Sequence, residues 1–305
     1  MENSYEVIIV GAGPSGWSAS IFLSRAGVKT LVVGQDGESG LSYAADVRNF
    51  PGFPDGISGR TLLDNMIEQS VREGVMYKRD EVTHIEEREG LVFVKTASLK
   101  EFSAEKLILA HGANYIKANI PGEKEYRNKG VYYCATCDGP LYKGKEAIVL
   151  GNGNLAAEEA IELVTYAKSV KIVSNNPEVN FSAGYANLLS SKNVEVIKAR
   201  AKEIKGNEFA DSLVLDNMDV LSLEGLFIAL GTASSLDFAR QLGLEVTGDF
   251  IKTNEGMLTN NENIWACGMA RGGINQVTKS VGEATTAAVN VIKSLKGLPN
   301  YIDHT

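Results

Sequence analysis

A glycine-rich turn occurs twice in this chain of 305 residues, each time between a short apolar run and a helical pattern. The first copy is Gly11-Ala-Gly13-Pro14-Ser15-Gly16, and the second, 140 residues later, is Gly151-Asn-Gly153-Asn154-Leu155-Ala156. The first glycine permits a sharp bend, the second lets a pyrophosphate approach the backbone, and the small third residue lets the helix pack on the strand. The N–H groups that begin the helix then face the phosphates. Two such copies predict an α/β protein with two Rossmann-like dinucleotide-binding domains.

The same strand, turn, helix and strand order is predicted around each copy. In the first, strand 7–10 and a helix to about Ala26 precede strand 29–33; in the second, strand 147–150 and a helix to about Lys168 precede strand 169–173. The remaining predicted elements are a helix at 61–73, strands at 82–85, 91–96, 106–110, 226–230 and 263–268, and a last helix at 281–295.

Composition and charge exclude several classes of protein. With 44% hydrophobic and 22% charged residues, the chain has the composition of a globular protein of about two domains. Its net charge of −8 lacks the basic footprint of a nucleic-acid-binding protein. No apolar run approaches the roughly 18 residues of a membrane span, and the N-terminus does not resemble a signal peptide. We therefore expect a cytoplasmic protein with neither membrane nor nucleic acid as partner.

Two of the three cysteines form the pair Cys134-x-x-Cys137, directly before Asp138. Cysteines at this spacing can close a small, reducible disulfide, and Asp138 can donate or accept a proton during thiol chemistry. A zinc site is one alternative, but there is no second such pair and the three histidines are scattered, so we expect no metal. A pair of inert buried thiols is the other alternative.

The order of several motifs resembles the low-molecular-weight thioredoxin reductases over nearly the whole chain. These motifs are the two glycine turns, Asn49-Phe-Pro-Gly52, Cys134-Ala-Thr-Cys137-Asp138-Gly139, and Ala266-Cys-Gly268 followed by Asn275-Gln276-Val277. The resemblance implies an α/β fold with two Rossmann-like, three-layer domains, the second inserted into the first. Residues 1–115 and 241–305 would form a discontinuous FAD-binding domain, and residues 116–240 would carry the redox cysteines and a second dinucleotide-binding-like site. Members of this family are commonly homodimers.

The resemblance also implies roles for individual residues. Electrons would pass from FAD to the Cys134–Cys137 disulfide, through Cys137 as the cysteine nearer the flavin, and then to a thioredoxin-like protein, with Asp138 handling the proton. Gly34, Gln35 and Asp36 would lie near the adenosine ribose, and the second site would be formed by Gly151, Gly153, Asn154, Leu155 and Ala156. The other residues expected to contact FAD are Gly11, Gly13, Pro14, Ser15, Gly16, Asn49, Val82, Gly268, Gln276 and Val277.

The chain departs from this family where its members that use NADPH carry arginines for the 2′-phosphate, a role suited to the guanidinium group. The corresponding segment 173–182 contains no Arg, Lys or His. An NADH-binding chain would place an acid near the tip of this strand, where Ser174 and Asn175 stand instead. Bases from elsewhere, such as Lys192 or Arg200, are an alternative. The segment otherwise predicts that NADPH is not the electron donor.

A one-electron carrier such as ferredoxin is then a reasonable donor, as in the pyridine-nucleotide-independent thioredoxin reductases. Residues 117–146 hold six bases against four acids, a local excess that favours an acidic partner. The second glycine turn would be an unoccupied remnant or would hold another dinucleotide, such as a second flavin.

Two further departures concern the flavin. Gly268-Met269 replaces the Gly-Asp pair of the family, and Glu38-Ser39-Gly40 replaces its Gly-Gly-Gln loop. Both changes remove polar groups, so we expect altered or weaker FAD binding. His111 is interpreted as a turn residue, with a flavin neighbour as the alternative, and Cys267 as a packed thiol.

The sequence therefore predicts a flavin-dependent disulfide oxidoreductase of the thioredoxin reductase type that does not use NADPH. The alternatives are a conventional NADPH-dependent thioredoxin reductase with an atypical nucleotide loop, a flavin dithiol oxidase, and a non-catalytic nucleotide-binding or redox-sensing module.

Overall fold

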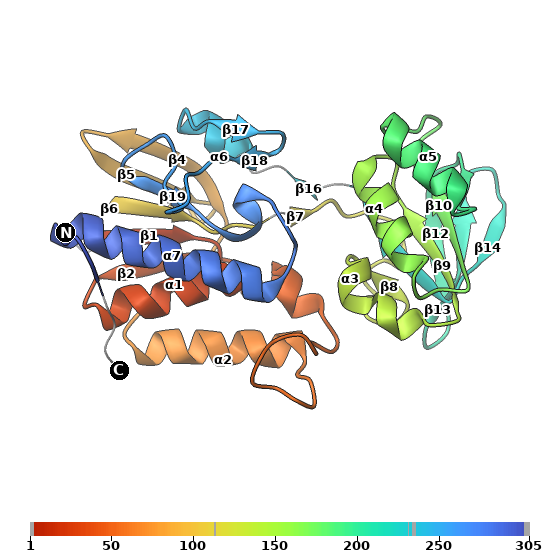
Figure 1. Ribbon diagram of the computed structural model, residues 1–305, viewed down its shortest axis with the longest axis horizontal. Coiled ribbons are helices and arrows are strands. Elements are labelled where there is room, and N and C mark those ends of the chain that lie inside the picture. The colour runs from red at the N-terminus through yellow and green to blue at the C-terminus, as the bar shows by residue number, and fades with distance from the viewer. Residues whose placement is uncertain (1–2, 113, 231, 234–235, 302–305) are drawn as a thin grey trace. The chain divides into compact units, whose positions relative to one another are not determined.

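A computed structural model describes residues 3–112, 114–230, 232–233 and 236–301, without the side chains of residues 38, 114, 115, 137, 232, 233 and 236. The chain forms two compact units (Figure 1). The first comprises Met1–Ser42, Arg48–Asn114 and Ser234–Thr305, and the second comprises Tyr43–Val47 and Tyr115–Ala233.

The first unit is built on a seven-stranded sheet in the order β3-β2-β1-β6-β5-β4, with β19 paired to β6. The sheet has a parallel part, formed by β3, β2, β1, β6 and β19. It also has an antiparallel meander, formed by β4, β5 and the beginning of β6. The strands are β1 (Ser4–Val10), β2 (Thr30–Gly34), β3 (Met76–Arg79), β4 (Val82–Arg88), β5 (Leu91–Thr96), β6 (Glu101–Leu109) and β19 (Ile264–Ala266).

Alternating side chains of β1 separate the layers of this unit. Ile8 and Val10 join a buried cluster with residues of β4 and β5, whereas Ile9 faces the helix that follows the turn, near Gly16. Helix α1 (Pro14–Arg25) packs between α2 (Gly59–Arg72) and α7 (Val277–Lys296), and the three helices lie together in Figure 1. The first unit therefore has a helical layer, a sheet and a meander layer.

The second unit contains a parallel sheet in the order β11-β10-β9-β15-β8. Its strands are β8 (Val131–Tyr132), β9 (Glu146–Leu150), β10 (Ser169–Val173), β11 (Glu195–Ile197) and β15 (Gly225–Ile228). One face packs on helices α3 (Ala135–Asp138), α4 (Asn154–Leu163) and α5 (Ala183–Ser191). The other face packs on an antiparallel sheet of β12 (Ala201–Gly206), β13 (Ala210–Leu215) and β14 (Val220–Ser222).

The short elements lie mainly at connections. They are η1 (Asp36–Glu38), η2 (Gly40–Tyr43), β7 (Asn114–Tyr115), η3 (Gly139–Tyr142), β16 (Thr232–Ala233), α6 (Leu236–Gln241), β17 (Val246–Thr247), β18 (Phe250–Ile251) and η4 (Gly268–Arg271). The domain limits predicted from the sequence, 115/116 and 240/241, lie one residue beyond the first division and inside α6 at the second. Helix α6 packs through Phe238 and Ala239 on the core of the first unit.

The predicted fold class is confirmed: the chain has an α/β fold with Rossmann-like units, and each glycine turn lies between a strand and a helix. Helix α4 was predicted too long. It ends at Leu163 because two tight turns follow, Thr165 N–H to Glu162 and Tyr166 N–H to Leu163, and the Tyr166 carbonyl accepts a hydrogen bond from Gly144.

The start of α7 and one small sheet also differ from the prediction. Helix α7 begins at Val277 rather than 281, because Gln276 serves as its N-cap residue. The antiparallel sheet of β12, β13 and β14 was not predicted. Its strands are short, and their buried residues, such as Ile204 and Leu213, form a core only when packed against the parallel sheet.

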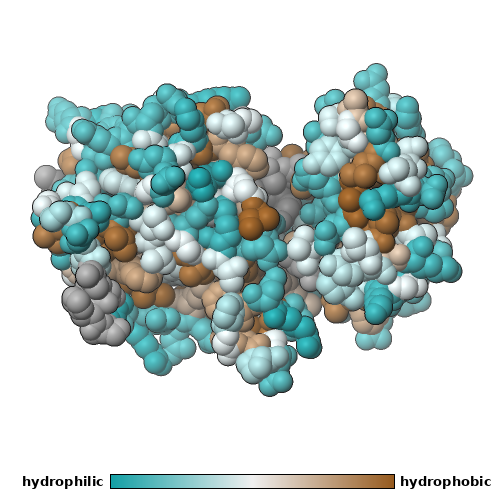
Figure 2. All heavy atoms as spheres, in the orientation of Figure 1, coloured by the Kyte–Doolittle hydropathy of each residue, from teal (hydrophilic) through white to brown (hydrophobic). Residues whose placement is uncertain are grey.

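The surface of the face shown in Figure 2 is mostly hydrophilic, with hydrophobic residues in small groups between polar ones. Among the residues that the structure describes, there is no helix with the length and apolar character needed to cross a membrane.

Candidate active site

The first glycine turn is closely packed against its neighbours. Gly11 has a φ of 122°, and a Cβ atom there would lie 2.3 Å from the carbonyl oxygen of Ala110. A Cβ atom on Gly16 would lie 1.9 Å from the carbonyl oxygen of Gly11. The sharp bend and the close approach of α1 therefore both require glycine, as the sequence pattern predicts.

The beginning of α1 offers donors to an anion. Pro14 occupies the first turn and Gly13 is the N-cap residue, with no acidic side chain in that turn. The N–H groups of Ser15 and Gly16 have no intrahelical acceptor because they lie in the first turn. The Ser39 hydroxyl is buried without a hydrogen-bond partner in the described structure, 3.4 Å from where a Gly13 Cβ would stand. A phosphate at this turn would satisfy these groups.

Two of the other residues predicted to bind FAD, Gly34 and Gly268, pack against this turn and the start of α1. A Cβ atom on Gly34 would stand 2.6 Å from the backbone nitrogen of Ala12, and one on Gly268 would stand 2.1 Å from the Ser15 hydroxyl. Asn49 donates a hydrogen bond of 2.8 Å to Gln276, directly before Val277, the first residue of α7. Val82 lies at the start of β4, half-buried against the core, and Gln35 is exposed.

Asp36, at the tip of β2, is buried and bound by three neighbours. Its carboxylate lies 2.8 Å from Arg60, 3.0 Å from Arg79 and 3.0 Å from the Tyr77 hydroxyl. Burial acts to raise the pKa of Asp36. Hydrogen bonds from Arg60 and Tyr77 and the charge of Arg79 outweigh burial and hold this pKa below its ordinary value. Asp36 is therefore an anion that links β2 to α2 and β3.

The turn after β19 is held by Glu283, a residue that the sequence analysis did not single out. Its carboxylate accepts hydrogen bonds of 2.9 Å from the Gly268 N–H and from Lys279, and it also pairs with Arg271. Lys279 donates to the Gly268 carbonyl oxygen at 3.0 Å. Glu283 thus supplies an internal carboxylate to the turn that contains Met269. An acidic residue in a helix is common on protein surfaces, so only its partners identify it.

Cys267 and His111 also lie in the first unit, and their burial bears on how each was interpreted from the sequence. Cys267 is fully buried, and burial raises the pKa of its thiol to about 12, so it is a packed, un-ionised thiol. Both ring nitrogens of His111 are buried without a hydrogen-bond partner in the described structure, and its ring packs edge-on against Phe238 at 5.2 Å. Burial lowers the pKa of His111 to about 4, so the ring is neutral.

The residues around the first turn fit a bound dinucleotide such as FAD. The glycines leave room for a pyrophosphate beside the backbone, and α1 directs N–H groups toward it. The unpartnered Ser39 hydroxyl is close to Gly13, and His111, whose ring nitrogens are also unpartnered, has its backbone beside Gly11. A bound group would provide a partner for the Ser39 hydroxyl.

The second glycine turn has the same backbone construction. The Gly151 N–H donates 2.9 Å to the Val173 carbonyl, as Gly11 does 2.8 Å to Val33. A Cβ atom on Gly151 would stand 2.1 Å from the Ala229 carbonyl oxygen. Ala156 is fully buried and Leu155 packs beside the same core cluster. A Cβ atom on Gly153 would meet nothing within 4 Å.

The loop after β10 folds onto this second turn. Asn180 N–H donates 2.7 Å to the Asn152 carbonyl oxygen and forms a backbone bridge with Gly153. Ser182 N–H donates 2.9 Å to the Asn154 side chain. At the tip of β10, the buried Ser174 hydroxyl bonds to Asn176. The side chains at this tip are therefore engaged within the protein.

The tip of β10 also contacts the backbone beside one basic residue, Arg200. Asn175, with a φ of 53°, accepts a hydrogen bond of 2.9 Å from the N–H of Ala201. Ala201 follows the exposed Arg200, one of the two bases that the sequence analysis kept as an alternative phosphate contact.

The predicted redox segment begins at the end of β8. Cys134 is buried and forms a disulfide, whereas Cys267 is free. Cys137 lies in α3, and its side chain is outside the described part of the chain, so its pairing with Cys134 stays a prediction. Asp138 ends α3, with its backbone N–H 3.1 Å from the Cys134 carbonyl oxygen. Its carboxyl is buried, and burial raises its pKa to about 7.

A second carboxyl, Glu159 of α4, reaches the same segment and was missed by the sequence analysis. Its side chain accepts a hydrogen bond from the N–H of Ala135, the residue after Cys134. Burial raises the pKa of Glu159 to about 7 despite this hydrogen bond. The available signal was an acidic pair, Glu158-Glu159, in the helix after the second glycine turn, but the pattern does not show which of the two points inward.

Aromatic side chains support the residue before Cys134. The guanidinium of Arg127 lies 4.5 Å from the ring centroid of Tyr43 and 5.7 Å from that of Tyr133. The Tyr133 hydroxyl donates a hydrogen bond of 2.6 Å to the buried Glu123, which also accepts 2.6 Å from the N–H of Asn119. This network anchors the strand that leads into the disulfide.

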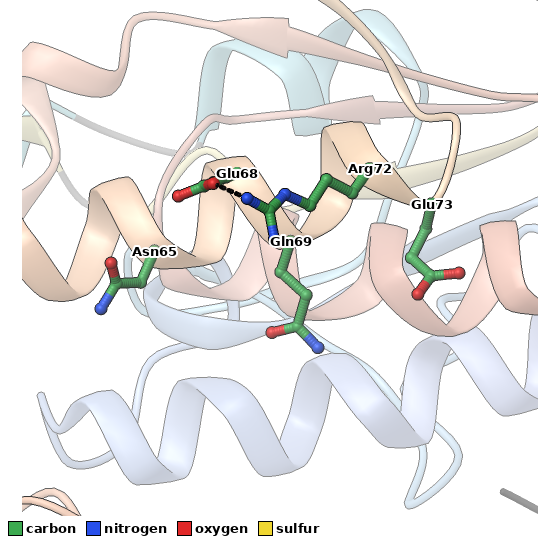
Figure 3. A pocket seen from close by; sticks show the side chains of 5 residues that line it. All are labelled: Asn65, Glu68, Gln69, Arg72 and Glu73. Atoms are coloured by element: carbon green, nitrogen blue, oxygen red, sulfur yellow. Dashed lines mark hydrogen bonds and ion pairs between the residues drawn. The ribbon is translucent and has the colours of Figure 1, made fainter.

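Two hollows lie elsewhere in the first unit. Figure 3 shows one on α2, lined by Asn65, Glu68, Gln69, Arg72 and Glu73, where Arg72 pairs with Glu68. All five side chains come from one helix and its end, and none is a predicted site residue. The other hollow is lined by residues 48–54 and includes Asn49. Within the described residues, no group of three or more His, Cys, Asp or Glu side chains is arranged to hold a metal ion.

Comparison with known proteins gives one consistent result. A family model described as pyridine nucleotide-disulphide oxidoreductase matches residues 5–284. The chain is 32% identical to a thioredoxin reductase of Bacillus subtilis, covering 95% of this chain and 94% of the relative. It is also similar to the crystal structure of thioredoxin reductase from Streptococcus pyogenes, with 28% identity, a TM-score of 0.85 and coverage of 98% and 100% of the two chains. The atypical thioredoxin reductase TRi from Desulfovibrio vulgaris Hildenborough is 32% identical, with a TM-score of 0.56 and coverage of 97% and 100%.

Proposed function

This chain belongs to the pyridine nucleotide-disulphide oxidoreductase family and, within it, to the thioredoxin reductases, and we propose that it reduces a thioredoxin-like protein with electrons from a donor other than NADPH or NADH. It is an FAD-dependent disulfide oxidoreductase. The observation that carries the choice of donor is the loop at 174–182, which lacks a cation and folds onto the second glycine turn.

The loop supports this choice in two ways. A 2′-phosphate bound without a cationic partner would lose its hydration without compensation, and no base is present between Ser174 and Ser182. The backbone bridge between Gly153 and Asn180 lies at the glycine that a pyrophosphate would approach. The second glycine turn is therefore proposed to be a structural remnant.

A ferredoxin-type protein fits the surface charge of the segment 117–146, which contains Cys134. Of the four acids in residues 117–146, Glu123 and Asp138 are buried, so only Glu125 and Glu146 are exposed. The exposed bases of the same segment are Lys124, Lys129, Lys143 and Lys145. This surface excess of positive charge would attract an acidic electron carrier and raise its association rate.

We further propose that the first unit holds FAD through the residues predicted from the sequence, with Ser39 and His111 added. FAD, when bound, accepts electrons from the donor and passes a pair to the disulfide. Cys134 and Cys137, once reduced, form a dithiol whose thiolate attacks the disulfide of the partner protein. A mixed disulfide forms, the second cysteine displaces the partner as a dithiol, and the Cys134–Cys137 disulfide closes again. The homodimer and the cytoplasmic location stay predictions.

Asp138 is proposed to protonate the leaving thiolate when the Cys134 disulfide opens. A carboxyl with a pKa raised to about 7 is protonated below that pH, so the rate of disulfide reduction should fall as the pH rises through 7. Replacing Asp138→Asn should lower the rate about 100-fold at pH 6 and flatten the pH profile. The measurement is the rate of thioredoxin reduction between pH 5.5 and 9. A variant with an unchanged profile would remove Asp138 from this role.

The choice of donor is tested by anaerobic titration of the flavin. We expect the flavin absorbance to persist with excess NADPH and with excess NADH, and to bleach within seconds with dithionite-reduced ferredoxin. As a control, the flavin is reduced chemically and thioredoxin is then added. Reduction of thioredoxin shows that the protein is intact. Rapid bleaching by NADPH would contradict the proposal.

One observation favours a second candidate, a conventional NADPH-dependent thioredoxin reductase. The contact between Asn175 and Ala201 brings the backbone next to Arg200 to the tip of β10. If Arg200 binds the 2′-phosphate, NADPH will bleach the flavin, and Arg200→Ala will raise the KM for NADPH about tenfold or more without a matching change in kcat.

A further inference from the structure

Helix α4 places a carboxylate beside the disulfide segment. Ala156, Ala157 and Ala160 of α4 are fully buried against the core of the second unit. Glu159 lies on the side of the helix that meets α3, where its carboxylate accepts a hydrogen bond from the N–H of Ala135. Ala135 is fully buried and follows Cys134 directly. The helix that begins at the second glycine turn therefore holds the residue adjacent to the reactive cysteine.

The adjacent acid on α4 makes a different contact. Glu158 is exposed and accepts a hydrogen bond from the Tyr185 hydroxyl of α5. Glu162, one turn later, is bonded to the Tyr166 hydroxyl at 3.2 Å. Of these three neighbouring acids, Glu159 reaches the disulfide segment, whereas the other two bond to tyrosine hydroxyls elsewhere in the described part of the unit.

The charges facing Glu159 are negative. Glu158 and Glu162 of its own helix and Asp138 of α3 all act to raise the pKa of Glu159, in addition to its burial. The phenolic Tyr142 lies on η3, which also packs on α4. A carboxyl group in these surroundings loses its proton near neutral pH. The negative charge of the carboxylate then disfavours the thiolate form of the neighbouring cysteine.

We propose that Glu159 is a positioning residue for the disulfide centre: it holds Ala135 through its N–H group, and its charge opposes ionisation of the Cys134 thiol. The inference rests on the proposed function, because it assumes that Cys134 cycles between disulfide and thiol. The consequence is a thiol whose reactivity changes with the protonation of Glu159.

The test compares two matched variants, Glu159→Gln and Glu158→Gln. Glutamine at 159 keeps an oxygen that can accept from Ala135 but removes the charge. The proteins are reduced with dithiothreitol, which is oxidised to its cyclic disulfide, and are then alkylated with iodoacetamide between pH 6 and 10. Modification of Cys134 is measured by mass spectrometry. We expect Glu159→Gln to alkylate about threefold faster than the wild type at pH 7.5, with its thiol titration moved to lower pH.

Glu158→Gln, the same change one residue away, keeps the Glu159 carboxylate and its contact with Ala135, so it should move the alkylation profile less than Glu159→Gln does. Identical profiles for the wild type and both variants would overturn the proposal. If Glu159→Gln does not fold, the wild-type protein decides the question. The amide resonance of Ala135 should shift with pH around a midpoint near 7, and a resonance unmoved between pH 5 and 9 would contradict the role of Glu159. Neither measurement uses the natural electron donor or thioredoxin, so failure of the proposed donor leaves this result unaffected.

Discussion

Replacing Cys134→Ser is expected to reduce the rate of thioredoxin reduction by at least ~1,000-fold, because a hydroxyl can neither form the disulfide nor act as the attacking thiolate. Cys134 is the cysteine with a disulfide in the described structure, and it lies between the anchored Tyr133 and Ala135. The measurement is single-turnover reduction of thioredoxin by chemically reduced enzyme, which does not depend on the natural donor. The flavin absorbance should be unchanged, since Cys134 lies outside the residues proposed to hold FAD.

The matched control is Cys267→Ala. Cys267 is free and fully buried, and burial raises the pKa of its thiol to about 12, so it supplies no thiolate at neutral pH. We expect this variant to keep the wild-type rate. Full activity in Cys134→Ser would exclude a dithiol mechanism and favour a nucleotide-binding or redox-sensing protein.

The second large effect is expected from the middle glycine of the first turn. Gly13 has extended backbone angles that any residue adopts, and an added Cβ atom would make only an ordinary 3.4 Å contact with Ser39. Gly13→Val should therefore fold, but the larger side chain would occupy the space where the pyrophosphate approaches. We expect FAD affinity to fall by at least ~100-fold, which corresponds to about 3 kcal/mol. Flavin retention after gel filtration and a fluorescence titration with FAD measure it.

Gly153→Val is the equivalent change in the second turn, where an added Cβ atom would meet nothing within 4 Å. If this turn is a remnant, the variant should keep its FAD and its rate of thioredoxin reduction within about twofold. Loss of a bound nucleotide or of donor-dependent turnover in Gly153→Val would show that the second turn holds a ligand. Full FAD retention in Gly13→Val would remove the first turn from the proposed FAD site.

The two glycine turns were predictable because their function depends on consecutive residues. The bend at Gly11 and the close approach at Gly16 are local consequences of having no Cβ atom. The same holds for the first strand and helix of each unit, where hydrophobic spacing and a helix stop agree. The length of α4 was not predictable in this way, because the chain turns at Leu163 to bring Tyr166 against Gly144.

The antiparallel sheet of β12, β13 and β14 was not predicted for a related reason. Short strands with few buried residues acquire their preference from packing, and β-propensity depends strongly on that context. Ile204 and Leu213 are buried only because the opposite face of the parallel sheet covers them.

The sequence by itself determined the fold class, the family resemblance and the absence of a cation between Ser174 and Ser182, because each resides in contiguous residues whose chemistry is readable without coordinates. Only the tertiary structure decided which side chains meet across the chain. It joins Asn49 to Gln276 over 227 positions and Glu159 to Ala135 over 24. Such pairs depend on the direction in which packed helices and strands present their side chains, and no local pattern encodes that direction.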